Sequence, residues 1–201
     1  MLFRSNDDSR QASYKNLRSK KRQKLKKSLM IEQGFLCCYC EMALKDDNSH
    51  IEHFKPQKEF PELALDYQNL LCSCLRDIKK EEEEKHPIHC GHKKGDYFEQ
   101  ELLISPLNPD CESRFKFLDD GRIEAKDSQD TAAKNTIEKL GLDIENLRDK
   151  RKKAIDPFLY LENVDLSELK KFVVTYLKQD ENGRFNEFWT TIKYFNRDLF
   201  I

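Results

Sequence analysis

The first 34 residues show a helical pattern of apolar positions. Residues 11–33 contain neither Gly nor Pro and consist mainly of good helix formers. Their thin apolar stripe consists of Leu17, Leu25, Leu29 and Met30. Gly34 follows, and glycine commonly ends a helix because it adopts the left-handed conformation without steric cost. The pattern therefore predicts one long helix that stops at Gly34.

After Gly34 the pattern changes to short elements. Residues 35–74 contain a tight cysteine turn, a polar turn, the strand-like HIEHF, a loop with proline and the run LDYQNLLCSC. Metal sites often organise small mixed segments of this kind. Residues 76–89, RDIKKEEEEKHPIH, form a charged low-complexity insertion that offers no apolar face to bury. We expect this insertion to be an exposed loop.

A pattern that can pack a core returns after Gly95. The run FKFLDDGRIEA predicts a hairpin around Asp120 and Gly121. Helical stretches follow at 130–140, at 143–160 and at 166–199, the last divided around Asn182 and Gly183. The final part carries the aromatic residues Phe185, Phe188, Trp189, Tyr194 and Phe195. At helical spacing, such residues favour a core or a partner interface over a base-stacking surface.

Charge is unevenly distributed along the 201 residues. The chain has 36 Lys and Arg and 37 Asp and Glu, a net charge of -1, yet residues 1–36 hold ten basic and three acidic residues, a local charge of +7. This asymmetry favours nucleic acid or an acidic partner at that end, although a solvated helix is the alternative. No apolar run approaches the roughly 18 residues of a membrane span, and the polar start resembles no signal peptide. We therefore expect no membrane and a cytoplasmic location.

Cysteine and histidine are concentrated in one segment, because six of seven Cys and all five His lie between residues 37 and 92. Cys37 and Cys40 have the C-x2-C spacing that lets two thiolates of one turn reach the same Zn²⁺. Cys74 and Cys90 can complete a tetrahedral site across the insertion, since loop closure becomes costly only slowly with length. Cys38 competes with Cys37, and Cys72 with Cys74. Unligated buried cysteines are the alternative.

A nuclease of the ββα-metal class needs a histidine base, ligands for one divalent ion and an asparagine that fixes the base. The sequence supplies such residues in order: Glu52 and His53 in HIEHFKP, Asn69 before LL, and the run CGHKKG at residues 90–95. This order is similar to the HNH nuclease motif with zinc-knuckle cysteines. Gly91 stands where many HNH proteins have asparagine, so His92 is the best local replacement as distal metal ligand.

Further motifs narrow the resemblance. CCYCE, HIEHFKP, LDYQNLLCSC, HCGHKKGD, ISPLNPDCE and the final F-x-F-x-x-DGRI together resemble PtuB, the HNH subunit of Septu-type anti-phage systems that also occurs as a retron-associated effector. The resemblance extends from about Phe35 to Arg151. It implies an α+β fold with a ββα-metal core and zinc knuckle over residues 35–128. A basic helical segment, 1–34, and a helical subdomain, 129–201, would flank it.

The resemblance also implies roles for single residues. His53 would be the general base, since an unperturbed His pKa of about 6.5 suits proton abstraction near neutral pH. Asn69 would orient it, accepting a ring N–H through its backbone carbonyl while its side chain holds the loop. Glu52 and His92 would hold Mg²⁺ or another divalent ion, with His50 as third candidate. Adjacent strand residues point to opposite faces, so Glu52 and His53 converge only where the strand ends or bulges.

Other residues of this region have simpler explanations. For His86 and His89 we expect surface or structural positions, and two lysines such as Lys93 and Lys94 are usually solvated. The resemblance further implies an ATPase partner that restrains the nuclease, and the aromatic C-terminal helices are the expected docking surface. The substrate is nucleic acid, either DNA or RNA. Two alternatives remain: a non-catalytic zinc-knuckle module that binds nucleic acid or protein, and a stand-alone restriction-like HNH nuclease.

Overall fold

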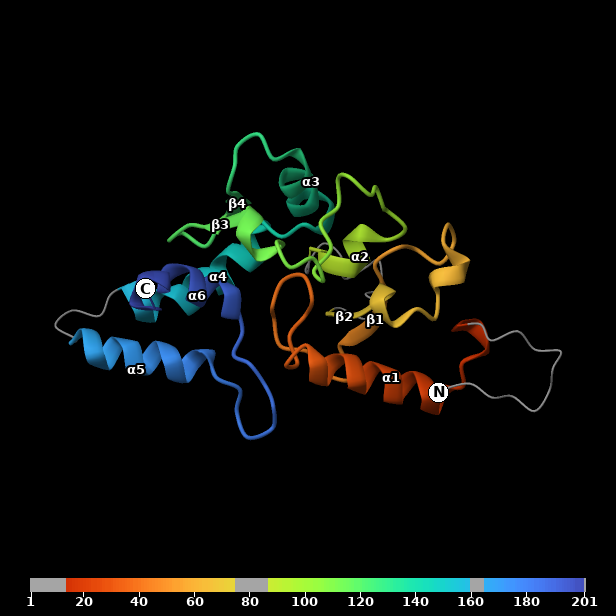
Figure 1. Ribbon diagram of the computed structural model, residues 1–201, viewed down its shortest axis with the longest axis horizontal. Coiled ribbons are helices and arrows are strands. Elements are labelled where there is room, and N and C mark those ends of the chain that lie inside the picture. Colours follow the sequence, from red (N-terminus) through yellow and green to blue (C-terminus); the bar gives the residue numbers. More distant parts are fainter. Residues whose placement is uncertain (1–13, 75–86, 160–164, 201) are drawn as a thin grey trace.

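The computed structural model describes residues 14–74, 87–159 and 165–200 (Figure 1). Its helices are α1 (Ser19–Glu32), α2 (Cys90–Lys94), α3 (Thr131–Leu140), α4 (Glu145–Leu159), α5 (Leu166–Leu177) and α6 (Trp189–Phe195). Its strands are β1 (Ser49–His53), β2 (Leu70–Cys74), β3 (Phe115–Phe117) and β4 (Ile123–Ala125). Short 3-10 turns lie at η1 (Tyr14–Asn16), η2 (Pro61–Leu63), η3 (Tyr67–Asn69), η5 (Glu112–Arg114) and η6 (Arg197–Phe200). This mixture of helices and small sheets confirms the predicted α+β class.

Helix α1 is shorter than the predicted helix over 11–33. It begins at Ser19, after Arg18 in an extended conformation, and the preceding turn η1 is separate. Burial of Leu17 and contact of Tyr14 with the core stabilise this break, which local propensity alone does not predict. The predicted stop at Gly34 is confirmed. Gly34 has φ +57°, and the backbone N–H groups of Gly34 and Phe35 donate to helical carbonyls in a Schellman arrangement.

The predicted strand HIEHF corresponds to β1, which pairs antiparallel with β2. The register places Ser49 opposite Cys74 and His53 opposite Leu70. Every residue of β2 is buried, because the β1–β2 pair lies between α1 and α2 (Figure 1). Most of the charged insertion, residues 76–86 with His86, lies outside the described residues.

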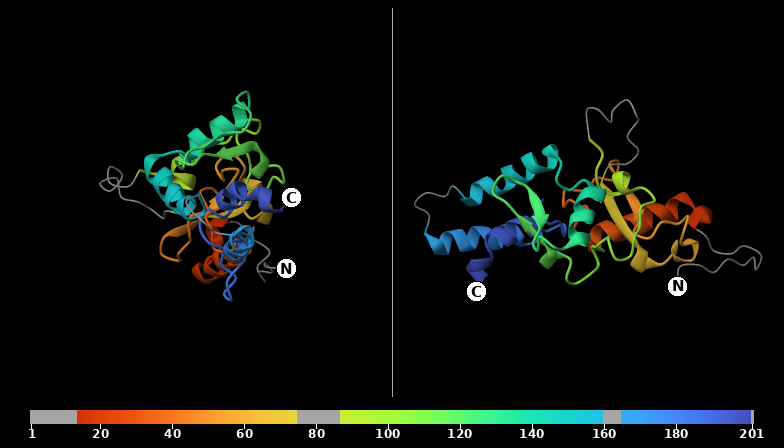
Figure 2. Two further views of the ribbon diagram at one scale, coloured as in Figure 1. Left: turned by 90° about the vertical axis from the view of Figure 1, so that its left-hand side faces the viewer. Right: turned by 90° about the horizontal axis from the view of Figure 1, so that it is seen from above.

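The predicted second hairpin is present as β3 and β4, joined across Gly121. Helix α3 ends where glycine predicts, and Gly141 has φ +61° directly after it. The predicted division around Asn182 and Gly183 lies inside a longer connection, because α5 already ends at Leu177 and α6 begins only at Trp189. Figure 2 shows α4, α5 and α6 gathered at one end of the molecule. Their own small core consists of Ile155, Phe158, Val173 and Ile192. In the described residues, no helix is long and apolar enough to cross a membrane.

The segment before α6 folds back onto the cysteine turn near α1. The backbone N–H groups of Phe185 and Phe188 donate to the carbonyls of Gly34 and Glu41. The Phe185 ring also leaves no room for a β-carbon on Gly34. Phe188 is buried, and its ring faces the guanidinium of Arg151. These aromatic residues therefore belong to the protein's own packing.

Candidate metal centre and active site

Four cysteine side chains meet in the interior of the protein. The described residues hold one group of His, Cys, Asp or Glu side chains able to share a metal ion, namely Cys37, Cys40, Cys74 and Cys90. Their sulfur atoms all lie within 4.8 Å of one another, and all four residues are buried and free of disulfides. Tetrahedral Zn²⁺ with Zn–S bonds of about 2.3 Å needs sulfurs about 3.8 Å apart. The cluster could therefore bind zinc, and Cys38 and Cys72 lie outside it.

The sulfur of Cys37 accepts hydrogen bonds from neighbouring thiol and backbone donors, which stabilise its thiolate form. Burial acts to raise the pKa of Cys37, but hydrogen bonds from the other thiols lower it well below its usual value. The backbone N–H of Cys74 also donates to the Cys37 sulfur at 3.3 Å. His89, for which we expected a surface or structural position, is only 7% exposed, and its Nδ1 lies 3.0 Å from Cys90 Sγ. His89 thus lines the cluster, and its adjacency to Cys90 was the signal for it.

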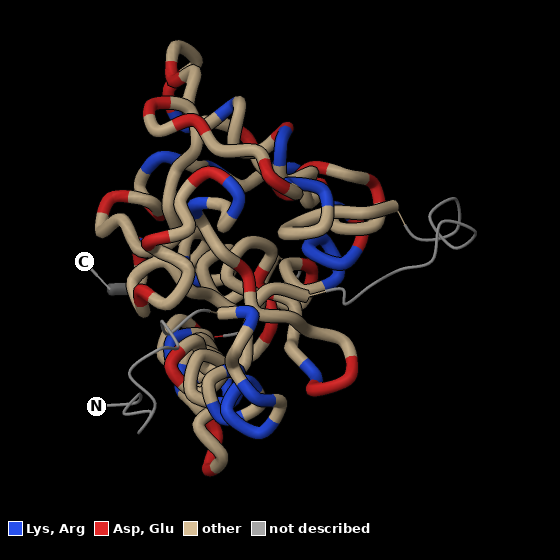
Figure 3. Tube along the Cα trace, turned by 90° about the vertical axis from the view of Figure 1, so that its right-hand side faces the viewer, with Lys and Arg blue, Asp and Glu red and all other residues tan. Residues whose placement is uncertain are grey.

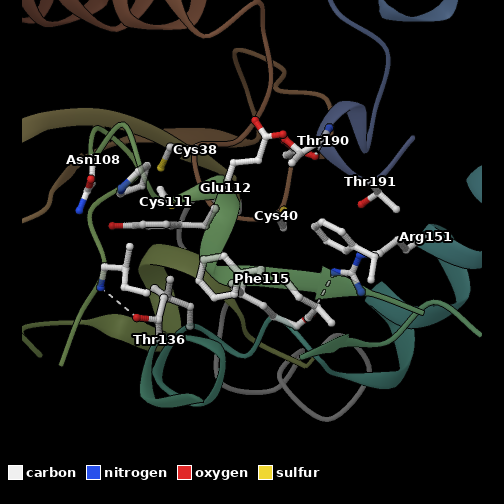
Figure 4. Close-up of a pocket in the computed structure, with 18 of the residues that line it drawn as sticks. Cys38, Cys40, Asn108, Cys111, Glu112, Phe115, Thr136, Arg151, Thr190 and Thr191 are labelled. Carbon is white, nitrogen blue, oxygen red and sulfur yellow. Dashed lines mark hydrogen bonds between the residues drawn. The ribbon is translucent and has the colours of Figure 1, made fainter. Parts of the chain in front are cut away.

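The three other cysteines lie outside this cluster. Burial raises the pKa of Cys72 to about 12 and the pKa of Cys111 to about 11, so both are thiols at neutral pH. Cys38 and Cys111 line a cavity of about 340 Å³, together with Cys40 of the cluster, Arg151 and Thr191 (Figure 4). Neither the packing nor the charge of this cavity identifies a ligand.

A groove of about 710 Å³ opens at the end of β1. Both Glu52 and His53 line it, together with residues of η1, η2 and α2. Because β1 ends at His53 and Pro56 follows, two adjacent strand residues reach the same space. Both residues therefore border one groove, and their convergence on a phosphate stays a prediction.

Glu52 is nearly buried and surrounded by donors. Its Oε1 lies 2.8 Å from Lys94 Nζ and 3.3 Å from the Tyr39 hydroxyl, which donates to it. Its Oε2 lies 3.2 Å from His50 Nε2. Burial acts to raise the pKa of Glu52, but His50 and Lys94 lower it below its usual value, so the carboxylate is ionised. A β-carbon at Gly91 would lie 2.5 Å from Glu52 Oε2, which is too close for two non-bonded atoms. Only glycine at this position therefore avoids a steric clash with the carboxylate.

His53 is held at both ring nitrogens. Nε2 lies 3.1 Å from the carbonyl of Ala64, and Nδ1 lies 3.2 Å from the side-chain amide of Gln57. Since a carbonyl only accepts, Nε2 carries the proton and Nδ1 keeps its lone pair. The Tyr14 ring packs edge-on at 4.6 Å. Burial lowers the pKa of His53, which favours the neutral imidazole.

Asn69 does not bind the His53 ring, contrary to our expectation. Its backbone carbonyl accepts from the N–H of Phe54, because the β1–β2 pairing directs it to the backbone. The side chain does hold the loop as predicted. It accepts from the N–H of Lys55 at 2.7 Å and donates to the carbonyls of Lys55 and Leu63. Asn69 therefore fixes the loop that carries Ala64, and Ala64 in turn orients His53.

The rings of His50 and His92 pack against each other, and neither residue is among those that line this groove. Their ring centroids are 5.0 Å apart, and His50 Nδ1 is buried without a hydrogen-bond partner in the described residues. Within that same part of the chain, Glu52, His50 and His92 do not meet closely enough to form a three-ligand group. Their role as metal ligands stays a prediction.

The comparisons with known proteins agree with the resemblance to HNH endonucleases. No family model matches the chain. The curated relatives include a protein named "Retron Vc95 putative HNH endonuclease" of Vibrio cholerae serotype O1 biovar El Tor, 34% identical over 136 residues, which are 64% of this chain and 62% of that protein. The Septu protein PtuB of Bacillus thuringiensis is 31% identical over 85 residues, 41% of this chain and 28% of the relative. The Septu protein PtuB of Bacillus mycoides is 29% identical over 121 residues, which are 49% of this chain and 40% of that relative.

The chain is thus similar to a retron protein whose name gives it as a putative HNH endonuclease, and to two Septu PtuB proteins. The chain spans less than two thirds of the length of each of these relatives.

Proposed function

We propose that this protein is a metal-dependent HNH nuclease that hydrolyses phosphodiester bonds of nucleic acid. The observation that carries the proposal is the shared groove of Glu52 and His53. The groove lies at the end of the β1–β2 pair, and α2 packs on that pair and begins at a cysteine of the buried cluster. Two antiparallel strands followed by a short helix have the order expected of a ββα-metal core.

In this proposal His53 is the general base. The Ala64 carbonyl holds the proton on Nε2, so the lone pair of Nδ1 is available to a water molecule. The Gln57 amide now occupies that position at 3.2 Å, and a water can replace it there. Proton transfer to Nδ1 would make the water nucleophilic toward phosphorus, and the bond from phosphorus to the leaving oxygen would break.

The residues present fit two kinds of metal. The four buried cysteines would hold a structural Zn²⁺, which stabilises the fold when bound. Glu52 and His92, with His50 as third candidate, would hold Mg²⁺ or a similar ion, which polarises the phosphodiester and neutralises the leaving oxygen. The Glu52 carboxylate suits such an ion, and His50 and Lys94 lower the pKa of this carboxyl so that it is ionised.

Nucleic acid would reach the groove along α1. Figure 3 shows Lys and Arg gathered on this helix, and its exposed cations include Lys20, Lys24 and Lys27. The turn η1 connects this surface to the groove, because Tyr14 and Lys15 line it. A row of lysines binds phosphate backbone without reading sequence. Water attack on phosphorus needs no 2′-OH, so both DNA and RNA are candidate substrates.

The resemblance supports a role as effector subunit of an anti-phage complex with an ATPase. Of the predicted aromatic docking residues, Phe188 is buried and the other four are only partly exposed. More exposed apolar residues of α4 and α5 are therefore better candidates: Leu159, Leu166 and Phe172. We expect Phe172→Asp to weaken ATPase binding at least about tenfold in a pull-down titration. Thr175→Asp, an exposed change on the same helix, is the matched control. If Phe172→Asp binds the ATPase as tightly as Thr175→Asp and wild type do, this surface is not the docking surface.

The nuclease proposal is tested with the purified chain, plasmid DNA or single-stranded RNA, and Mg²⁺ or Mn²⁺, with and without the ATPase. Wild type should cleave, and His53→Ala should reduce the rate at least about 100-fold while zinc content and melting temperature persist. Lys134→Ala, an exposed change on α3, should cleave normally. Binding without cleavage by wild type would instead identify a non-catalytic zinc-knuckle module.

A further inference from the structure

The side chain of Lys94 is buried against Glu52 and His53, two residues that line the groove, although lysine is rarely buried. It is the last residue of α2, and its side chain is 0% exposed. The ammonium lies 2.8 Å from Glu52 Oε1 and donates to the carbonyls of His53 at 3.1 Å and Gly95 at 3.2 Å. An ammonium has three N–H donors, so these three acceptors satisfy it completely.

This arrangement fixes the orientation of the Glu52 carboxylate. Lys94 and the Tyr39 hydroxyl hold Oε1, so the other oxygen faces His50 and the backbone of Gly91. A carboxylate without such partners would rotate freely between its two equivalent orientations. A buried ion pair costs desolvation on both sides and gives little net stability, so its value lies in geometry.

Lys94 also connects three parts of the site. One ammonium binds the side chain of Glu52 and the backbone of His53, the two adjacent residues that share the groove. The same helix begins at Cys90, so the position of Lys94 is set from the cysteine cluster. A displacement of α2 would thus change Glu52 and His53 together.

We propose that Lys94 is a positioning residue of the nuclease: its ammonium orients the Glu52 carboxylate and the end of β1 so that Glu52 and His53 face one groove. This inference rests on the proposed function. It differs from the expectation from sequence, which placed Lys94 in solvent.

The pair itself is tested by a double-mutant cycle on the zinc-loaded full chain. Lys94→Met and Glu52→Gln should each lower the melting temperature, because each leaves one buried partner uncompensated. The double variant should lose clearly less than the two single losses added together. Additive losses would show that the two side chains do not interact and would overturn the proposal.

The positioning role is tested by kinetics at saturating Mg²⁺. Lys94→Met should lower kcat about 100-fold and leave KM for the nucleic acid within about twofold, since misplacement by an ångström costs that much. Lys94→Arg should recover part of the rate, because it restores a buried cation. Lys134→Met makes the same substitution at an exposed lysine of α3, and it should change neither kcat nor KM. A kcat within about twofold of wild type in Lys94→Met overturns the proposal.

The two outcomes can be separated. If wild type shows no cleavage but the melting temperatures remain coupled, the proposed nuclease function fails and the Lys94–Glu52 pair stands. If wild type cleaves while Lys94→Met cleaves equally well, the positioning role fails and the nuclease function stands.

Discussion

At the scale of single residues, the proposed hydrolysis of phosphodiester bonds depends on the protonation state of His53. Burial lowers its pKa below the ordinary value of 6.5, while the Ala64 carbonyl and Glu52 partly oppose this. The ring is therefore neutral at pH 7, as a general base must be. In the unfolded chain His53 binds a proton with its ordinary pKa of 6.5, which is higher than its pKa in the folded protein. Acidification below pH 6.5 therefore also lowers the stability of the folded protein.

This state predicts the pH dependence of cleavage. The rate should reach a plateau toward alkaline pH and should fall on acidification, with an inflection below 6.5. A pH–rate profile of kcat/KM at constant ionic strength measures it, and circular dichroism at each pH excludes unfolding. An inflection above 6.5 would contradict the assignment of His53 as base.

The sequence predicted which residues lie near the groove better than it predicted their partners. Strand alternation and the proline after HIEHF place Glu52 and His53 at the end of a strand. The hydrogen-bond partners of Asn69, Lys94 and His89 depend on how segments that are distant in sequence pack against one another. The spacing of residues along the chain does not predict this packing. Gly91 is similar: only the packed position of Glu52 shows why a β-carbon is excluded there.

At the scale of secondary structure elements, the cysteine cluster joins the turn after α1, the end of β2 and the start of α2. These elements are short, and a small mixed core of this kind gains much of its stability from a metal. The sulfur atoms come from three places that are distant in sequence, yet all lie within 4.8 Å. Metal loss should therefore disturb the groove, because α2 positions Lys94 and β2 supports β1.

We predict one Zn²⁺ per chain. Cys40→Ser should release it and lower the free energy of unfolding by about 4 kcal/mol, as expected when a structural metal is lost. Cys111→Ser, a change outside the cluster, should retain the zinc. Elemental analysis and urea denaturation measure both effects. Full zinc content in Cys40→Ser would show that this cysteine is not a ligand.

Helix ends were the most predictable feature, because glycine after α1 and α3 adopts a conformation that other residues reach only at a cost. Helix starts were less predictable. The break before Ser19 depends on the burial of Leu17, a tertiary contact that overrides the continuous helix propensity of the lysine-rich run.

At the scale of the whole molecule, a net charge of -1 conceals a basic helix beside the groove. The Lys20, Lys24 and Lys27 side chains of α1 are exposed, and η1 leads from this helix to Tyr14 and His53. Phosphate binding at this surface would release counterions, so affinity should decrease steeply with salt.

We predict that replacing Lys20, Lys24 and Lys27 together with alanine reduces the slope of log affinity against log salt by about 2 to 3, at roughly 0.9 per phosphate contact. Fluorescence anisotropy with a labelled duplex from 50 to 200 mM salt would measure it. The control replaces three exposed lysines of the other helical end: Lys170, Lys171 and Lys178. An unchanged slope for the α1 variant would contradict nucleic-acid binding by this helix.

The most direct test of the central claim is chemical rescue of the base. His53→Gly removes the imidazole and opens its space, so cleavage in Mg²⁺ should fall at least about 100-fold at unchanged zinc content. Added imidazole should then restore cleavage in proportion to its neutral form, and should leave the wild-type rate unaltered. Undiminished cleavage by His53→Gly in the absence of imidazole would contradict the account.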